Sequence, residues 1–291
     1  MLKFEKVVEN IYLLRTPFST LWTGVTLLTG EKNFLIDSGA EEPEAYILPA
    51  LREMGMEIHD IDYLLNTHCH GDHIGGHHSL ASRYGLRVAT IDVGVEPLRD
   101  PAANAVRIRT KFPADSPAPQ SWLKGVGVDV VLRDGEVLEN RLKVISTPGH
   151  DRDCVCFYDI PTKTVISGDS IQGNGTPTQG IGFYRSLRDY TDSIEKLKRE
   201  EIDNILCGHE YDGIGDVISG RGNVRKALSY CSDRVQVYEE EVRSCLARGM
   251  TGEREIAAEL IRKIGCGMPD RLFLAMYTVQ EHIKHIKEKE Q

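Results

Sequence analysis

The sequence lacks long hydrophobic runs, and this limits where the protein can reside. No segment approaches the ~20 consecutive apolar residues that a membrane-spanning helix needs. The N-terminal stretch MLKFEKVVENIYLL is interrupted by charged side chains, which is not the pattern of a secretory signal. We therefore expect a protein without a membrane-spanning segment.

Paired cysteines are also missing. The seven cysteines are an odd number, lie scattered along the chain and form no CxxC pair. A chain of this length without a disulfide framework is typical of the cytoplasm. We expect most of these cysteines to be small buried hydrophobic residues.

Basic residues are in the minority, with 35 Lys and Arg against 44 Asp and Glu and a net charge of -9. An acidic balance disfavours non-specific binding to nucleic acid or to an anionic membrane. With 291 residues, 41% of them hydrophobic, the chain is long enough for one large α/β domain with an appendage, or for two domains.

Strand-like and helix-like segments alternate in two halves of the chain. Short β-branched and aliphatic runs fill residues 4–36 and 126–171, and helical spacing appears at 43–55 and near 189–200. From about Asp216 onward strand signals disappear, and residues 222–247, 253–264 and 271–289 read as helices. This order suits a two-sheet sandwich with helices outside. Residues 97–121 suggest an irregular insertion or a short helix with loops, and form a candidate lid.

One segment concentrates residues that bind metals. Thr67 to Gly76, THCHGDHIGG, holds three imidazoles and a carboxylate within six positions, directly after the buried strand expected at 61–67. Neutral imidazole and carboxylate are good ligands for zinc and for iron. His68 and His70 share a face if the strand continues, and the turn at Gly71 can direct Asp72 and His73 toward a second ion.

Three later motifs each place one more histidine or aspartate after an apolar run. TPGHD contains His150, SGDS contains Asp169 and CGHE contains His209, and each follows an apolar run and sits among small turn residues. A lone histidine is more often structural, but three such sites after strands make coincidence a poor explanation. We therefore predict that these residues join the histidine-rich segment in one metal centre.

The ordered motifs HxHxDH, TPGH, SGD and a later GH resemble those of the metallo-β-lactamase superfamily. Asp37 in LIDSGA matches the first motif of that family, an aspartate near a strand end that is not a ligand. The resemblance implies an αββα sandwich of the α/β class, with residues 1–215 as the catalytic domain and 216–291 as a helical C-terminal extension. It also implies seven ligands: His68, His70 and His150 at site one, Asp72, His73 and His209 at site two, and Asp169 bridging both.

The resemblance further implies hydrolysis. Two metal ions, zinc with iron or manganese as alternatives, would lower the pKa of a bridging water toward ~7, and the resulting hydroxide would attack a carbonyl or phosphoryl centre. Asp72 is a candidate for moving a proton. Tyr184, in the loop before His209, is a second catalytic candidate, because its hydroxyl could steady an oxyanion. Ordinary aromatic packing is the alternative for Tyr184.

The remaining histidines lack such context. His77 and His78 are expected on a solvated helix face, with a contact to a ligand as the alternative. His59, His282 and His285 are expected at the surface.

The family hosts many reactions on one type of site, so several substrates stay open. A small acyl substrate, either a thioester of the glyoxalase II kind or a lactone, is the first choice. The alternatives are a phosphodiesterase or endoribonuclease of the same family and an iron-dependent oxidoreductase. A non-catalytic binding protein would be expected to have lost ligands, and none is missing here. The partner is expected to be a small molecule, and the tail helices are expected to shape the pocket or a homodimer contact.

Overall fold

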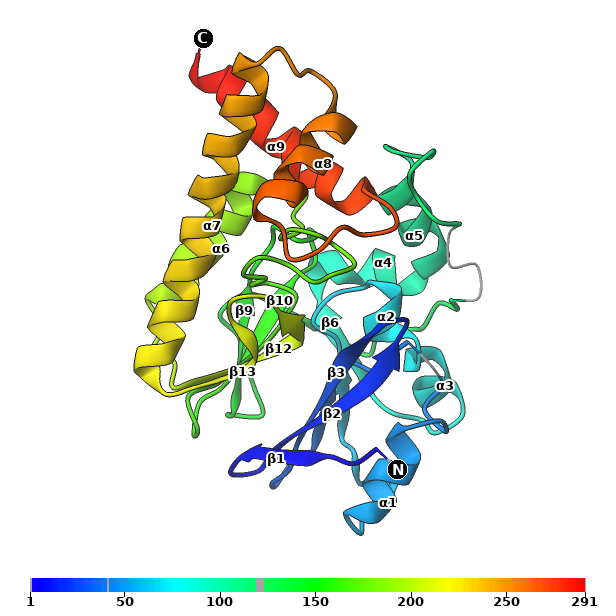
Figure 1. The fold of residues 1–291 in the computed structure, drawn as a ribbon. Helices are drawn as coiled ribbons and strands as arrows, with labels where there is room; N and C mark the ends of the chain where they lie inside the picture. The colour runs from blue at the N-terminus through cyan, green and yellow to red at the C-terminus, as the bar shows by residue number, and fades with distance from the viewer. Residues whose placement is uncertain (1, 41, 119–122, 291) are drawn as a thin grey trace.

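Two β-sheets lie face to face and carry helices on both outer surfaces (Figure 1). The computed structural model describes residues 2–40, 42–118 and 123–290. This arrangement of helices, sheet, sheet and helices is the αββα sandwich that the sequence predicted.

The first sheet has strand order β1 to β7. Its strands are β1 (Glu5–Val8), β2 (Ile11–Phe18), β3 (Leu21–Leu28), β4 (Phe34–Ile36), β5 (Tyr63–Leu65), β6 (Val88–Ile91) and β7 (Val130–Leu132). The first four strands pair antiparallel, as short turns between them require. From β4 to β7 the pairs are parallel, because helices connect these strands.

The second sheet has the order β13-β12-β11-β10-β9-β8. Its strands are β8 (Val137–Leu138), β9 (Leu142–Ser146), β10 (Val155–Asp159), β11 (Thr164–Gly168), β12 (Asn204–Tyr211) and β13 (Gly215–Ser219). The expectation that strands end near Asp216 is wrong, because β13 continues to Ser219 and pairs with β12. The predicted boundary between 215 and 216 therefore falls inside a strand.

Alternating side chains along the strands separate three hydrophobic layers. In β5, Leu64 packs with the helices outside the first sheet, whereas Leu65 faces the second sheet. In β12, Ile205 packs with the helices outside the second sheet and Leu206 faces inward. Successive side chains point to opposite faces of a strand, and both faces of these strands are buried. The strands are therefore apolar on both faces.

The helices divide between the two outer surfaces. The first sheet is covered by α1 (Ile47–Glu53), α2 (Gly71–Ile74) and α3 (His77–Ser82), and the second by α6 (Leu187–Lys198), α7 (Arg221–Ala247), α8 (Glu253–Ile264) and α9 (Phe273–Lys289). The predicted tail helices are confirmed, and the apolar stripe of α9 is buried against the second sheet's helical layer. No helix in the described part of the chain combines the length and apolar composition that a membrane span requires.

The described part of segment 97–121 is a short helix with loops, the second of the two expected alternatives. It follows the 3-10 turn Asp92–Gly94 and contains the end of α4 (Val95–Arg99) and all of α5 (Pro101–Arg109). Asp100 caps α5 by accepting a hydrogen bond from the amide of Ala103, and Pro101 occupies the first turn. Positions 119–121 of the predicted insertion lie outside the described residues.

Tyr184 lies in the hydrophobic core between the second sheet and its helices. Its ring stacks on Tyr190, and its hydroxyl forms a hydrogen bond with Nε2 of His282 at 2.5 Å. Both Tyr184 and His282 are buried, so the expectation of a surface His282 is wrong. The hydroxyl that was expected to steady an oxyanion is instead committed to α9. Packing was the correct alternative for Tyr184.

Because His282 is buried, the stability of the protein should depend on pH. Burial lowers the pKa of His282 from 6.5 to about 3. The unfolded chain takes up this proton near pH 6.5, whereas the folded state does so only near pH 3. The contribution of neutral His282 to stability is therefore complete above pH 6.5 and is lost as the pH falls from 6.5 toward 3. Within this window, His282 lowers the free energy of unfolding by up to about 1.4 kcal/mol for each unit that the pH falls.

We expect His282→Gln to reduce the fall in the free energy of unfolding between pH 6.5 and pH 5, compared with the unsubstituted protein. Urea unfolding at several pH values measures this slope. His59→Gln, at an exposed position, is the matched control and should leave the slope unchanged. Equal slopes in His282→Gln and the unsubstituted protein would contradict the prediction.

Candidate metal centre

Four segments bring the predicted ligands to one edge of the sandwich. His68 and His70 follow β5, Asp72 and His73 lie in α2, His150 follows β9, Asp169 follows β11, and His209 lies within β12. The pairing register of β12 with β13 shifts between Leu206 and Tyr211, the stretch that contains His209. Such irregularities redirect side chains beside functional sites.

All seven predicted ligands come together in three overlapping groups. The groups are His68, His70 and His150; His68, His73 and Asp169; and Asp72, His73 and His209. Within each group, one nitrogen or carboxylate oxygen per residue lies within 4.8 Å of the others. This spacing allows each group to surround one cation, and the shared members place the groups next to one another.

Asp169 lies between the two outer groups. Its Oδ2 is 3.4 Å from His150 Nε2 and 3.6 Å from His209 Nε2. Its Oδ1 is 3.3 Å from His73 Nε2. One carboxylate therefore faces imidazoles from both sides of the cluster, which is the geometry that a bridging ligand requires.

Each imidazole in the cluster has one ring nitrogen that faces the centre and a second one that contacts an oxygen atom outside it. The partners are Thr67 Oγ1 for His68 (3.2 Å), Asp151 Oδ2 for His70 (3.1 Å), Asp37 Oδ2 for His73 (2.8 Å), the Phe183 carbonyl for His150 (2.9 Å) and the Trp22 carbonyl for His209 (2.6 Å). Metal-binding histidines usually have such a partner, which orients the ring and leaves the second nitrogen for the ion.

The atoms directed at the centre of the cluster fit a cation. His68 Nε2, His73 Nε2 and Asp169 Oδ1 are buried without a hydrogen-bond partner in the described part of the chain. Burial lowers the pKa of His209, yet Asp169 and Asp72 outweigh burial and raise it to about 10. The two carboxylates thus favour positive charge at this point, which a metal ion would supply.

Asp37 supports the cluster without being one of its ligands. Its Oδ1 accepts from the Thr67 amide at 2.7 Å, and its Oδ2 accepts from Thr67 Oγ1 at 2.8 Å. The same Oδ2 meets His73 Nδ1. Asp37 has a φ of 63°, an uncommon backbone conformation that recurs at functional sites.

His77 is buried beside the cluster, contrary to expectation. His77 is 1% exposed and its Nδ1 lies 2.7 Å from Ser38 Oγ, so the expected solvated face is wrong for this residue. Burial, followed by the charge of His73, lowers the pKa of His77 to about 3. His78 is partly exposed and its Nδ1 lies 2.9 Å from the Gly125 carbonyl.

Asp151 contacts His70 of the cluster, a position that the sequence did not predict. It follows His150 directly in TPGHD, which was the available signal, but its partners are distant in sequence. Besides His70, its carboxylate accepts from Arg107 and Arg185. Burial alone would raise the pKa of Asp151, but its hydrogen bond and charge interaction with His70, together with the charges of Arg185 and Arg107, hold this pKa well below its usual range.

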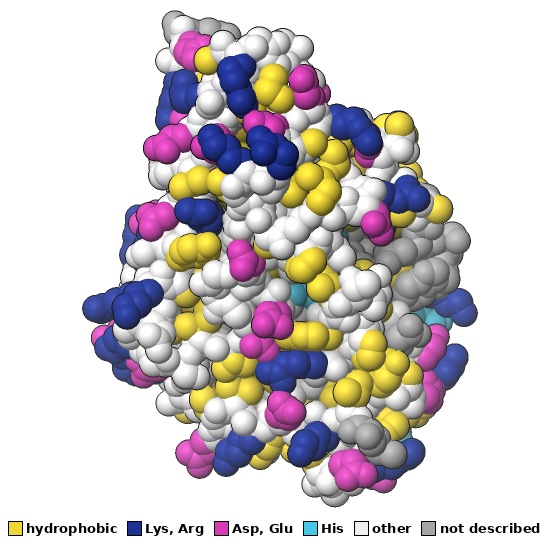
Figure 2. Space-filling view, in the orientation of Figure 1, with side chains coloured by type: hydrophobic (Ala, Val, Ile, Leu, Met, Phe, Trp, Pro, Cys, Tyr) yellow, Lys and Arg dark blue, Asp and Glu magenta, His cyan; other side chains and the backbone are white. Residues whose placement is uncertain are grey.

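His70 and His209 are the imidazoles of the cluster that reach the surface, with 13% and 6% of their side chains exposed. Figure 2 shows a small histidine surface near the centre of the view, between the helical tail above and the sandwich below. A cavity of about 430 Å³ next to Asp151 is lined by Arg107, Thr110, Lys111, Arg185 and Tyr277. The neighbouring imidazoles and this cavity form the candidate active site.

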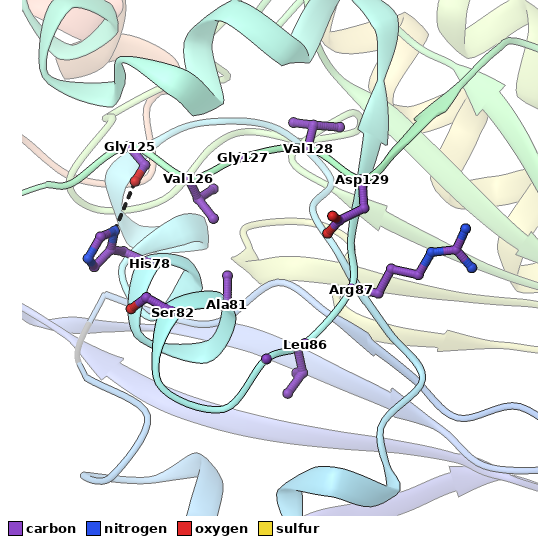
Figure 3. Close-up of a pocket in the computed structure, with 11 residues that line it drawn as sticks. His78, Ala81, Ser82, Leu86, Arg87, Gly125, Val126, Gly127, Val128 and Asp129 are labelled. Atoms are coloured by element: carbon purple, nitrogen blue, oxygen red, sulfur yellow. Dashed lines mark hydrogen bonds between the residues drawn. The ribbon is translucent and has the colours of Figure 1, made fainter.

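A second cavity of about 620 Å³ lies elsewhere, between α3, residues 85–87 that follow it and residues 125–129 (Figure 3). His78, Ser82, Arg87 and Asp129 are among its lining residues. None of the residues that line it belongs to the metal-type cluster. Although this cavity is larger, the chemistry of the side chains identifies the smaller one as the candidate site.

Comparisons with known proteins agree with this geometry. The model of the metallo-beta-lactamase superfamily matches residues 15–209. A metallo-beta-lactamase family protein from Thermus thermophilus superposes with a TM-score of 0.74 at 22% identity, covering 98% of this chain and 95% of that one. This likeness concerns the fold, and its coverage includes the helical tail.

Relatives with curated names support the same family. "Beta-lactamase-like protein 2 homolog" of Drosophila melanogaster is 26% identical over 264 residues, 90% of this chain and 80% of that protein. The protein of the same name from Caenorhabditis elegans is 28% identical over 197 residues, and the match spans 66% of this chain but only 57% of the relative. Hydroxyacylglutathione hydrolase of Brucella anthropi is 30% identical over 171 residues, 57% of this chain and 53% of that protein.

The matched region contains all seven clustered side chains. The prediction of a metal-dependent hydrolase is confirmed at the level of the family. The chain belongs to the metallo-β-lactamase superfamily.

Proposed function

We propose that this protein is a dinuclear metal-dependent hydrolase that cleaves a small acyl substrate. The observation that carries the proposal is the complete set of seven donor side chains in overlapping groups around Asp169. A non-catalytic binding protein would not need to keep the ligands of both metal sites. We place the catalytic centre in residues 1–215 and treat 216–291 as the helical extension that completes the pocket.

The ligand assignment follows the three groups. His68, His70 and His150 would hold one ion, Asp72, His73 and His209 the other, and Asp169 both. Three imidazoles suit zinc at the first position, and two imidazoles with a carboxylate suit zinc at the second, with iron or manganese as alternatives. When bound, the ions would activate a water molecule and polarise the bond to be cleaved.

The side chains around the ions have their own tasks. Asp72 Oδ2 is 3.2 Å from His209 Nε2 and accepts from Thr23 Oγ1 at 3.3 Å, so it is oriented from two sides. Its side chain is 13% exposed, the larger value of the two carboxylates of the cluster. We infer that Asp72 Oδ2 is the atom that receives or passes on a proton during hydrolysis.

A thioester is the preferred substrate because hydroxyacylglutathione hydrolases are among the relatives. A lactone is the second acyl candidate. A phosphodiesterase or endoribonuclease activity and an iron-dependent oxidation are the alternatives from other reaction classes. Lys, Arg, Asp and Glu side chains intermingle over the face in Figure 2, which favours a small molecule over a nucleic acid. The seven free cysteines, six of them buried, support a reducing, cytoplasmic setting.

The ligand assignment is tested by removing single donors. We expect His68→Ala and Asp169→Ala to remain folded but to bind less metal and to lose thioesterase activity, because each donor serves a shared ion. Elemental analysis, circular dichroism and a thioester assay measure the three properties. His59→Ala, at an exposed position, is the control. Full activity in either ligand variant would refute the assignment.

Asp151 provides a test of how His70 is held. Asp151→Ala removes the carboxylate that orients His70 and leaves two arginines near the ion, so we expect metal affinity to fall by about 10–100-fold. Competition with a chelator measures this affinity. Asp192→Ala, at an exposed position of α6, should bind metal normally. An unchanged affinity in Asp151→Ala would show that Asp151 does not position His70.

A substitution at Gly208 tests whether metal ions bind in the space beside Asp169 and His73. A Cβ at Gly208 would lie 2.4 Å from Asp169 Oδ1 and 2.8 Å from His73 Cε1. We therefore expect Gly208→Ala to displace these side chains and to reduce metal content in a protein that still folds. Gly127→Ala is the matched control, because its Cβ would meet nothing within 4 Å. Normal metal content in Gly208→Ala would argue against ions at this point.

A further inference from the structure

Three cationic side chains from distant parts of the chain line the cavity beside the metal-type cluster. Arg107 lies on α5, Lys111 follows that helix, and Arg185 precedes α6. Tyr277 of α9 contributes the aromatic wall. The Arg185 guanidinium lies 5.3 Å and the Lys111 ammonium 5.5 Å from the centre of this ring. No acidic side chain lines the cavity among the described residues.

The positive charge of this cavity is only partly neutralised. Among the described residues, Asp151 is the single carboxylate that contacts Arg107 and Arg185, and it also accepts from His70. Lys111 forms no salt bridge within the described ranges. Arg185 Nε is buried and has no hydrogen-bond partner there. Two guanidinium groups thus share one carboxylate, and the Lys111 ammonium remains available to a ligand.

Arg185 and Arg107 are held in place rather than mobile. Both guanidinium groups contact Asp151 at 2.9–3.1 Å, and the side chain of Arg185 is only 19% exposed. Arg107 also donates to Asn104 Oδ1. The Tyr277 hydroxyl donates to the carbonyl of Ile108, which ties α9 to α5. This network preorganises the cavity and reduces the entropy that a ligand must overcome.

The cavity lies close to the metal-type cluster, because Asp151 contacts both His70 and the two arginines that line the cavity. Phe183 lies between them, with its ring centre 6.3 Å from that of His70 and 6.0 Å from that of Tyr277. A substrate that extends from the imidazoles past Phe183 would bring its far end beside Arg185 and Lys111.

We propose that this cavity binds an anionic group of the substrate, a carboxylate or a phosphate, at a distance from the bond that is cleaved. The proposal rests on the hydrolase function proposed above and narrows its substrate class to acyl compounds with a negatively charged end. Guanidinium groups match the oxygen geometry of both anions, and the Lys111 ammonium adds an unpaired charge. Tyr277 would pack against the apolar part of the same substrate.

Matched thioesters test the proposal. The acetyl thioesters of three thiols of similar length, with a neutral, a carboxylate and a phosphate end, are compared by kcat/KM with the metal-loaded enzyme. We expect the anionic substrates to be preferred over the neutral one by about tenfold. The larger of the two preferences identifies whether carboxylate or phosphate is the natural end group.

Lys111→Glu should lower this preference about tenfold, because it reverses a charge that touches neither Asp151 nor the cluster. Lys226→Glu, at an exposed position of α7, makes the same change in net charge and should keep the preference. If the neutral and anionic thioesters are cleaved equally, or if both variants behave alike, the anion site is refuted while acyl hydrolysis stands.

A binding measurement separates this site from the proposed function. Succinate is titrated calorimetrically into the metal-loaded forms of Lys111→Glu and Lys226→Glu. We expect about tenfold weaker binding in Lys111→Glu, and equal affinities would overturn the anion site. If no thioester is cleaved, the acyl-hydrolase proposal fails, and this comparison alone decides whether the cavity binds anions.

Discussion

Seven ionisable side chains share one small buried volume, and much of the surrounding structure serves to keep them there. Such a cluster is costly without a compensating cation, because carboxylates and imidazoles lose their hydration and several inward-facing atoms have no protein partner among the described residues. The chain restrains the cluster from outside: Asp37, Asp151 and three other oxygen acceptors each fix one imidazole. Close packing adds to this restraint, since even a methyl group at Gly208 would displace Asp169.

The helical tail participates in this site although it contributes no metal-type ligand among its described residues. Tyr277 of α9 lies against Phe183, and Phe183 in turn packs on the rings of His70 and His150. The same tail shares a continuous hydrophobic core with the second sheet, so it is not an independently packed appendage. The tail therefore supplies one wall of the cavity in which we propose that an anionic substrate group binds. A common catalytic core can acquire a different substrate range through such an added wall.

Local sequence was a good guide to the cluster and a poor one to its supports. The spacing of His68, His70, Asp72 and His73 after a buried strand was sufficient to suggest metal ligands, because neighbouring residues on one strand and turn must lie close together. Asp151 was overlooked, since its contacts with Arg107 and Arg185 join segments more than 30 residues apart. Tyr184 and His282 show the opposite error: each looked like a surface or site residue, but 98 positions of sequence separate two halves of one buried hydrogen bond.

The sequence by itself determined the layered fold, the family and the residues able to bind metal, because these depend on hydrophobic periodicity and on motifs a few residues long. Only the tertiary structure decided which histidine is buried, where the second sheet ends and which charges surround the cavity. Burial depends on what packs against a side chain from elsewhere in the chain, as α9 does for Tyr184. Likewise, Arg107, Lys111 and Arg185 become one cationic wall only after α5, α6 and α9 have packed together.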